Sequence, residues 1–121
     1  MSMELTGEQI AEAFSRHDFE ASYPYLADDV RWNIVGERLV EGKGNVISVC
    51  RDSAEYLADV TADFRRLRKV TTDDCVVVDG VAEYTDKEGG QSRVASCDLY
   101  DFTNGNVSEI TSYTVDLGAQ R

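Results

Sequence analysis

The sequence predicts a single α+β domain over residues 1–121, in which a cone-shaped, curved antiparallel sheet with a mixed edge wraps round three helices and encloses a pocket. Helical periodicity is confined to the N-terminal half, and long alternating runs fill the C-terminal half. Asn104-Gly105 joins two of these runs, and Asn-Gly is typical of a tight hairpin turn. Three strands of such length twist and curl, so the helices are expected to cover the concave side.

Three segments have the signals of helices. Thr6 to Gln9 forms a capping box, and Ile10 to His17 continues it with a stripe of about three helical turns. Asp18 is a candidate cap for a second, short helix that reaches Leu26 and that either starts late or is distorted, because Pro24 fits only a first helical turn. Asn45 is the expected cap of a third helix, whose buried stripe runs to Val60.

Alternation of apolar and polar residues predicts the strands. Asp28-Asp29 ends the helical pair, and a short hairpin follows before the third helix. The expected strands are 30–35, 38–41, 64–72, 75–86, 91–103 and 106–117.

Charge and cysteine content restrict the partners. With 12 basic and 23 acidic residues the net charge is −11, which opposes binding to nucleic acid and to anionic membranes. The cysteines are Cys50, Cys75 and Cys97, an odd number without a CxxC motif, and one histidine cannot complete a Cys/His zinc site. We therefore expect reduced thiols, a cytoplasmic location, and neither metal nor cofactor. The N-terminus resembles no signal peptide, and no apolar run is long enough to span a membrane.

Four spaced fragments carry a family resemblance. They are Phe14 to Asp18, Leu26 to Val30, Glu41 to Gly44 and Asp101 to Val107. In this order they resemble the nuclear-transport-factor-2-like superfamily, which includes ketosteroid isomerase and the SnoaL-like polyketide cyclases. The resemblance implies a pocket for a small hydrophobic molecule. It also implies a homodimer formed through the outer sheet face, which strand parity assigns to Cys97, Leu99, Thr111, Tyr113 and Val115.

The resemblance singles out Asp98 as the candidate catalytic residue, because an acid of the isomerase lies at this place before the final hairpin. Burial without a nearby cation should raise its pKa, so that a protonated Asp98 donates a hydrogen bond to a ligand carbonyl. The alternative is an ionised Asp98 that accepts a proton, as a cyclase would need; the absence of a base near Asn33 favours the donor role. Parity and the resemblance predict a pocket lined by Phe14, Trp32, Ile34, Tyr56, Val94, Ser96, Tyr100, Phe102, Ile110, Ser112 and Thr114.

The chain departs from each related mechanism. Asn33 and its neighbours supply no carboxylate where the isomerase has its base, and the region of Ile10 supplies no oxyanion tyrosine. Ser112 stands in place of the cyclase acid, and Ser96 in place of the arginine of limonene epoxide hydrolases.

Three functions therefore remain open. The chain is an isomerase, cyclase or dehydratase that acts on a hydrophobic carbonyl compound, a non-catalytic ligand-binding domain, or a dimeric accessory module. We interpret His17 as structural, since a cation is favoured at the end of a helix. Entry of Arg66 or Arg68 into the pocket is a further possibility, and catalysis by a cysteine is not expected.

Overall fold

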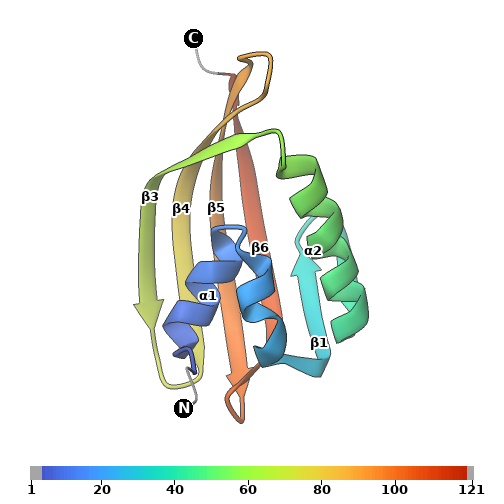
Figure 1. Ribbon diagram of the computed structural model, residues 1–121. Helices are drawn as coiled ribbons and strands as arrows, with labels where there is room; N and C mark the ends of the chain where they lie inside the picture. Colours follow the sequence, from blue (N-terminus) through green and yellow to red (C-terminus); the bar gives the residue numbers. More distant parts are fainter. Residues whose placement is uncertain (1–3, 120–121) are drawn as a thin grey trace.

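The structure, a computed structural model, describes residues 4–119 as two layers, with the helices on one face of a sheet (Figure 1). The helices are α1 (Gly7–Ser15), the 3₁₀ helix η1 (Phe19–Tyr25) and α2 (Lys43–Leu57). The strands are β1 (Leu26–Ile34), β2 (Arg38–Glu41), β3 (Thr61–Thr71), β4 (Cys75–Thr85), β5 (Gln91–Thr103) and β6 (Asn106–Ala119).

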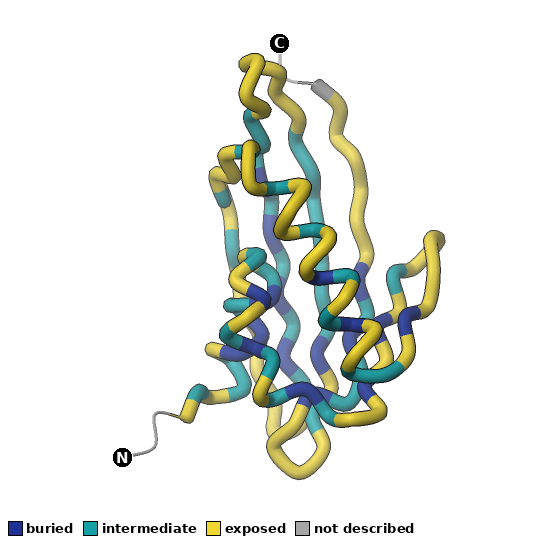
Figure 2. Tube along the Cα trace, turned by 45° about the vertical axis from the view of Figure 1, so that its right-hand side comes forward, coloured by how far each residue is buried: buried dark blue, intermediate teal, exposed yellow. Residues whose placement is uncertain are grey.

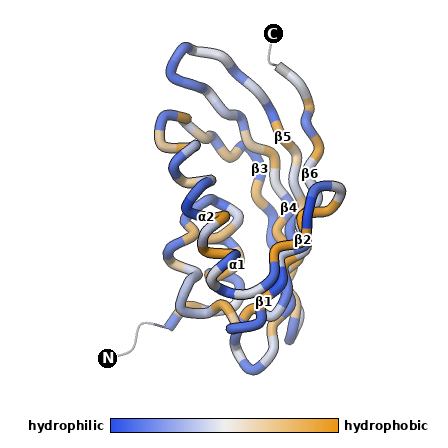
Figure 3. The backbone as a smooth tube through the Cα atoms, turned by 90° about the vertical axis from the view of Figure 1, so that its right-hand side faces the viewer, coloured by the Kyte–Doolittle hydropathy of each residue, from blue (hydrophilic) through white to orange (hydrophobic). Residues whose placement is uncertain are grey.

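The six strands lie in the order β2-β1-β6-β5-β4-β3. Only β1 and β6 pair in parallel, and every other neighbouring pair is antiparallel. Seen from the side, the sheet curves toward the helices (Figure 3). The predicted α+β class with a curved sheet of mixed edge is thus confirmed, and so is the hairpin turn, in which Asn104 and Gly105 both have positive φ.

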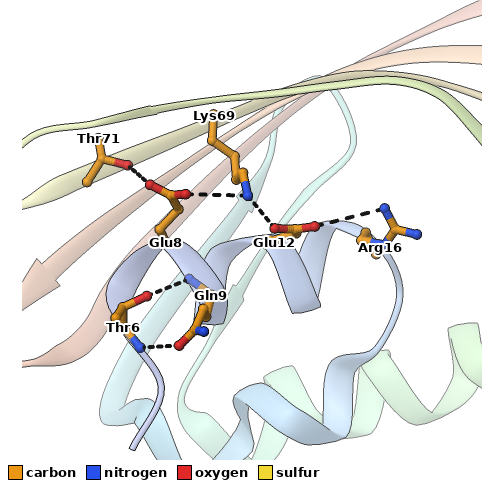
Figure 4. Close-up of polar contacts among 7 residues, drawn as sticks. All are labelled: Thr6, Glu8, Gln9, Glu12, Arg16, Lys69 and Thr71. Carbon is orange, nitrogen blue, oxygen red and sulfur yellow. Dashed lines mark hydrogen bonds and ion pairs between the residues drawn. The ribbon is translucent and has the colours of Figure 1, made fainter.

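The capping box begins α1 as predicted. Thr6 Oγ1 accepts from the Gln9 amide at 3.1 Å, and Gln9 Oε1 accepts from the Thr6 amide at 2.9 Å. Two residues of β3 contact α1: Lys69 Nζ lies 3.4 Å from Glu8 and 2.5 Å from Glu12, and Thr71 donates to Glu8 (Figure 4). These contacts are solvent-exposed, so they set the orientation of α1 over β3 more than they stabilise the fold.

Two boundaries near the second helix differ from the sequence-based expectation. The segment forms a 3₁₀ helix that holds Pro24, and the Asp18 side chain caps nothing. Leu26 already belongs to β1, where it pairs with Val107, so this strand begins four residues before the predicted Val30. An irregularity between Leu26 and Arg31 interrupts the pairing with β6. The alternation of apolar and polar residues is therefore broken here, and it does not reveal where the strand begins.

Three further boundaries lie earlier in the chain than the sequence predicts. Helix α2 begins at Lys43 after Gly42, whose φ of 91° favours glycine, while the Asn45 side chain donates back to the Glu41 carbonyl. The helix ends at Leu57, before Val60. Strand β3 begins at Thr61 rather than Phe64, because this edge pairs with the full length of β4.

Buried residues gather in one half of the molecule, where α1 lies on the sheet (Figure 2). Ile10, Ala11 and Phe14 of α1 pack there against the inner face of the sheet. The sheet continues beyond this packed half, and its far end is less buried. This uneven covering leaves room for a hollow on the inner face.

The outer face of the sheet carries the predicted apolar patch in part. Cys97 pairs with Tyr113, and Leu99 with Thr111. Tyr113 is 49% exposed and Val115 is 59% exposed, whereas Cys97, Leu99 and Thr111 are half-buried within the single chain. The homodimer predicted for this face stays a prediction.

We expect a charge placed in this patch to break such a dimer. Light scattering after size exclusion should give twice the mass of one chain for the wild type, and the mass of one chain for Tyr113→Glu. Lys87→Glu, at the exposed turn between β4 and β5, is the charge control and should stay dimeric. A wild type that is monomeric at high micromolar concentration would remove the idea.

Candidate functional site

A cavity of about 460 Å³ opens on the inner face of the sheet, beyond the end of α1 and under α2. Its floor comes from β1, β4, β5 and β6, and η1 and β3 add one aromatic residue each. The lining residues are Phe14, Ser15, His17, Phe19, Trp32, Ile34, Glu37, Arg38, Val49, Asp52, Ser53, Tyr56, Leu57, Phe64, Tyr84, Val94, Ser96, Asp98, Ser112 and Thr114.

Most of the residues predicted from parity lie on this wall. Asp98 is among them, together with Phe14, Trp32, Ile34, Tyr56, Val94, Ser96, Ser112 and Thr114. Their strands bring them together in cross-strand rows: Ile34 pairs with Ser112, and Ser112 with Asp98.

Three predicted lining residues lie elsewhere. Tyr100 and Ile110 are fully buried in the core. Phe102, near the opposite end of β5, lies against Gly7 and lines a separate hollow beside the start of α1. All three share the inner face with Asp98, but α1 covers this part of the face, and parity contains no information about where a helix lies.

Asp98 is the most deeply placed ionisable group on the cavity wall. Ser15 Oγ donates to Asp98 Oδ2 at 2.8 Å, and the Tyr100 hydroxyl lies 2.6 Å from Ser15 Oγ. Because the single Ser15 proton points to Asp98, Tyr100 is the donor in the second bond. On the other side Trp32 Nε1 donates to Ser112 Oγ at 2.9 Å, and Ser112 is also a hydrogen-bond partner of the Asp98 carboxyl.

Burial raises the pKa of Asp98, and the hydrogen bonds from Ser112 and Ser15 lower it by less. This is the direction predicted from the sequence. Within residues 4–119 no cation forms an ion pair with this carboxyl. Arg66 and Arg68 instead pair with Asp79 and do not line the cavity, whereas Arg38 lies exposed at the cavity mouth.

His17 and Tyr84 form a second polar pair on the wall. His17 Nε2 lies 2.8 Å from the Tyr84 hydroxyl, and the imidazole ring packs among Phe19, Phe64 and Tyr84. Burial lowers the pKa of His17, which favours the neutral ring. A neutral ring does not fit the expectation of a cation at the helix end, and His17 lines the cavity, while its structural role stays an interpretation.

Sequence reasoning missed Ser15 and undervalued His17 and Tyr84. The end of α1 holds Ser15 and His17 over the sheet, and no periodic pattern distinguishes them from neighbouring polar residues. The other missed group, formed by Glu37, Arg38 and Asp52, is exposed at the mouth.

The cysteines offer no nucleophile to the cavity. Burial raises the pKa of the Cys50 thiol to about 12, and none of the three cysteines lines the wall. Within residues 4–119 there is no group of three or more His, Cys, Asp or Glu side chains arranged to hold a metal ion. No helix in that range is both long and apolar enough to cross a membrane.

The raised pKa of Asp98 predicts a pH-dependent effect of Asp98→Asn on stability. Because the folded pKa lies above the unfolded value of about 3.9, the wild type loses stability as pH rises through the interval between them. Asparagine cannot ionise, so the variant does not share this loss. The free energy of unfolding of the variant minus that of the wild type should therefore increase from pH 4 to pH 7. Urea unfolding at both pH values measures this difference.

Asp101→Asn is the matched control, since it removes an exposed carboxyl from the same strand. If wild type and Asp98→Asn show parallel pH dependence, burial does not control the protonation of Asp98.

Comparison with known proteins places this geometry in a family. The family profile of the SnoaL-like domain matches residues 8–110. A nuclear-transport-factor-2-like protein of unknown function from Cytophaga hutchinsonii is 33% identical, with a TM-score of 0.80 over 94% of this chain and 100% of that one.

More distant structures share the fold. A candidate polyketide cyclase from Xanthomonas campestris is 19% identical, with a TM-score of 0.69 over 86% of this chain and 83% of that one. An LEH-like epoxide hydrolase from M. tuberculosis is 16% identical, with a TM-score of 0.68 over 89% of this chain and 81% of that one. None of the functionally curated proteins matches the sequence. The chain belongs to the SnoaL-like domain family and has the nuclear-transport-factor-2-like fold.

Proposed function

We propose that the protein is an acid–base enzyme of the isomerase or cyclase type, which binds a small hydrophobic carbonyl compound in the 460 Å³ cavity. The observation that carries this proposal is Asp98, a carboxyl with a raised pKa on the wall of a largely apolar cavity. Perturbed ionisable groups of this kind are concentrated at functional sites. A candidate polyketide cyclase and an epoxide hydrolase share the fold, so the scaffold is compatible with such chemistry.

The cavity suits a small apolar ligand. Its volume lies within the roughly 300–1,000 Å³ that is usual for small-molecule sites. Phe14, Trp32, Phe64 and Val94 supply apolar surface, and hydrogen bonds hold the polar side chains of Asp98 and Tyr84 on the wall. A flat hydrophobic molecule with one or two oxygen atoms matches this wall.

Asp98 acts in this proposal as a hydrogen-bond donor. Oδ2 accepts from Ser15, and in this proposal the protonated carboxyl donates to a ligand carbonyl. As the carbonyl oxygen gains negative charge in an enolate-like transition state, this hydrogen bond strengthens and lowers the barrier. Tyr100, Ser15, Ser112 and Trp32 hold the carboxyl in place through their chain of hydrogen bonds.

A base must accept the proton that leaves the ligand carbon. Asn33 on β1 lies where ketosteroid isomerase has its base, and an asparagine side chain cannot serve as a base. Glu37 and Asp52 line the same cavity from its mouth and are the carboxylates available for this step.

The alternative is a ligand-binding domain without catalysis. One observation favours it: the carboxylates nearest the mouth are exposed and lie on different elements from Asp98, so no acid–base pair is assembled without a ligand. Binding without turnover would establish this alternative.

Proton exchange on a simple ketone tests the enzyme. We expect the wild type to accelerate deuterium uptake at the acidic carbon of 2-tetralone in D₂O, followed by NMR. Asp98→Asn should reduce the acceleration by about 100-fold, the lower range for one acid–base group, and Asp101→Asn should leave it unchanged. Saturable binding of the ketone without deuterium exchange would contradict the enzyme proposal and support a ligand-binding domain. Native mass spectrometry of freshly purified protein would identify a retained ligand.

We also propose a cytoplasmic location, and we expect that nucleic acid is not a partner. A net charge of −11 repels phosphate backbones. We expect no gel shift of single-stranded or duplex DNA at physiological salt and micromolar protein. A salt-sensitive shift at submicromolar protein would contradict this expectation.

A further inference from the structure

The His17–Tyr84 pair has one unexplained feature, which lies on the far side of the imidazole ring. His17 Nε2 is hydrogen-bonded to Tyr84, but Nδ1 is buried and has no hydrogen-bond partner among residues 4–119. An unpaired buried N–H is rarer in proteins than an unpaired buried acceptor. The ring is therefore best satisfied as the neutral tautomer in which Nε2 carries the proton and Nδ1 carries none.

This tautomer decides the role of the tyrosine. With its proton on Nε2, His17 donates to the Tyr84 oxygen, and the hydroxyl proton of Tyr84 must find a different acceptor. No other hydrogen bond to this hydroxyl exists within the described residues. Burial raises the pKa of Tyr84, so the hydroxyl keeps its proton. Tyr84 thus presents an unused donor on the cavity wall.

The backbone supports a dedicated role for His17. Helix α1 ends in a turn in which the Asp18 amide donates to the Ala13 carbonyl and the His17 amide to the Phe14 carbonyl. The residue at the left-handed position of this turn is usually glycine, but here it is His17 with φ 69°. The chain accepts an unfavourable conformation at the place that brings an imidazole to Tyr84.

We propose that Tyr84, oriented by His17, donates a hydrogen bond to an acceptor oxygen of the ligand at a second polar point of the cavity, separate from Asp98. The register supports two points, since Val78 of β4 pairs with Asp98 whereas Tyr84 lies six residues farther along the same strand. The ligand therefore carries an oxygen acceptor at each of two positions on an apolar frame. The inference rests on the proposed small-molecule cavity and specifies its ligand class.

The tautomer can be measured without any ligand. His17 is the sole histidine of the chain, so the imidazole signals in a long-range ¹H–¹⁵N spectrum of untagged protein belong to it alone. At pH 7 we expect a neutral ring with the proton on Nε2. A proton on Nδ1, or on both nitrogens, would overturn the proposal.

The second acceptor is tested with two related ketones. 2-Tetralone has one carbonyl, and 6-methoxy-2-tetralone adds an ether oxygen at the opposite end. Calorimetry should show that the wild type binds the methoxy compound about threefold to tenfold more tightly, the range for one hydrogen bond. Tyr84→Phe keeps the ring but should abolish this preference. His17→Asn tolerates the same backbone conformation and should abolish it too, since asparagine is too short to hold Tyr84.

Two controls separate this inference from the role of Asp98. Tyr113→Phe removes an exposed tyrosine hydroxyl from the outer face and should leave the preference intact. Asp98→Asn should change the affinity for both ketones alike and preserve their ratio. If Tyr84→Phe keeps the wild-type ratio of affinities for the two ketones, the inference is wrong even if Asp98 acts as proposed. If Tyr84→Phe binds both ketones equally, the inference holds even if Asp98 proves inactive.

Discussion

The left-handed turn at His17 is the constraint on which the site depends. It ends α1 after nine residues and turns the chain directly into η1. Because the helix stops there, Ser15 reaches Asp98 and His17 reaches Tyr84, so one turn positions both polar points of the cavity. A left-handed residue other than glycine costs about 1–2 kcal/mol. The packing of the imidazole among three aromatic rings offsets this cost.

The cavity follows from a mismatch of lengths between helix and sheet. A helix of nine residues is about 13 Å long, whereas the 13 residues of β5 extend over about 43 Å. One short helix therefore covers only part of the inner face and buries Tyr100 and Ile110 beneath it. The uncovered part curves toward α2, and the cavity occupies the space between them.

The sequence predicts the sheet better than it predicts the site. Alternation places Asp98 and Ser112 on the inner face, because a period of two is fixed by the backbone. It cannot tell which inner residues lie under α1, and so it counts Tyr100 as lining. Leu26 was assigned to a helix because its strand pairing begins with an irregularity and depends on Val107, about 80 residues away. Ser15 and His17 depend on the place where a helix stops, and long-range packing determines that place.

Asp98 and His17, the ionisable groups at the two polar points, respond to burial in the same way, although one is an acid and the other a base. Desolvation raises the pKa of Asp98 and lowers that of His17, so burial drives both groups toward their neutral forms. The chain as a whole carries a charge of −11, yet the deep wall of its cavity is nearly uncharged. The ionic groups Glu37, Arg38 and Asp52 remain exposed at the mouth. A charged ligand would lose its hydration in this cavity without meeting a buried counter-ion. These properties of the wall match the uncharged, oxygen-bearing apolar ligand that we propose for this cavity.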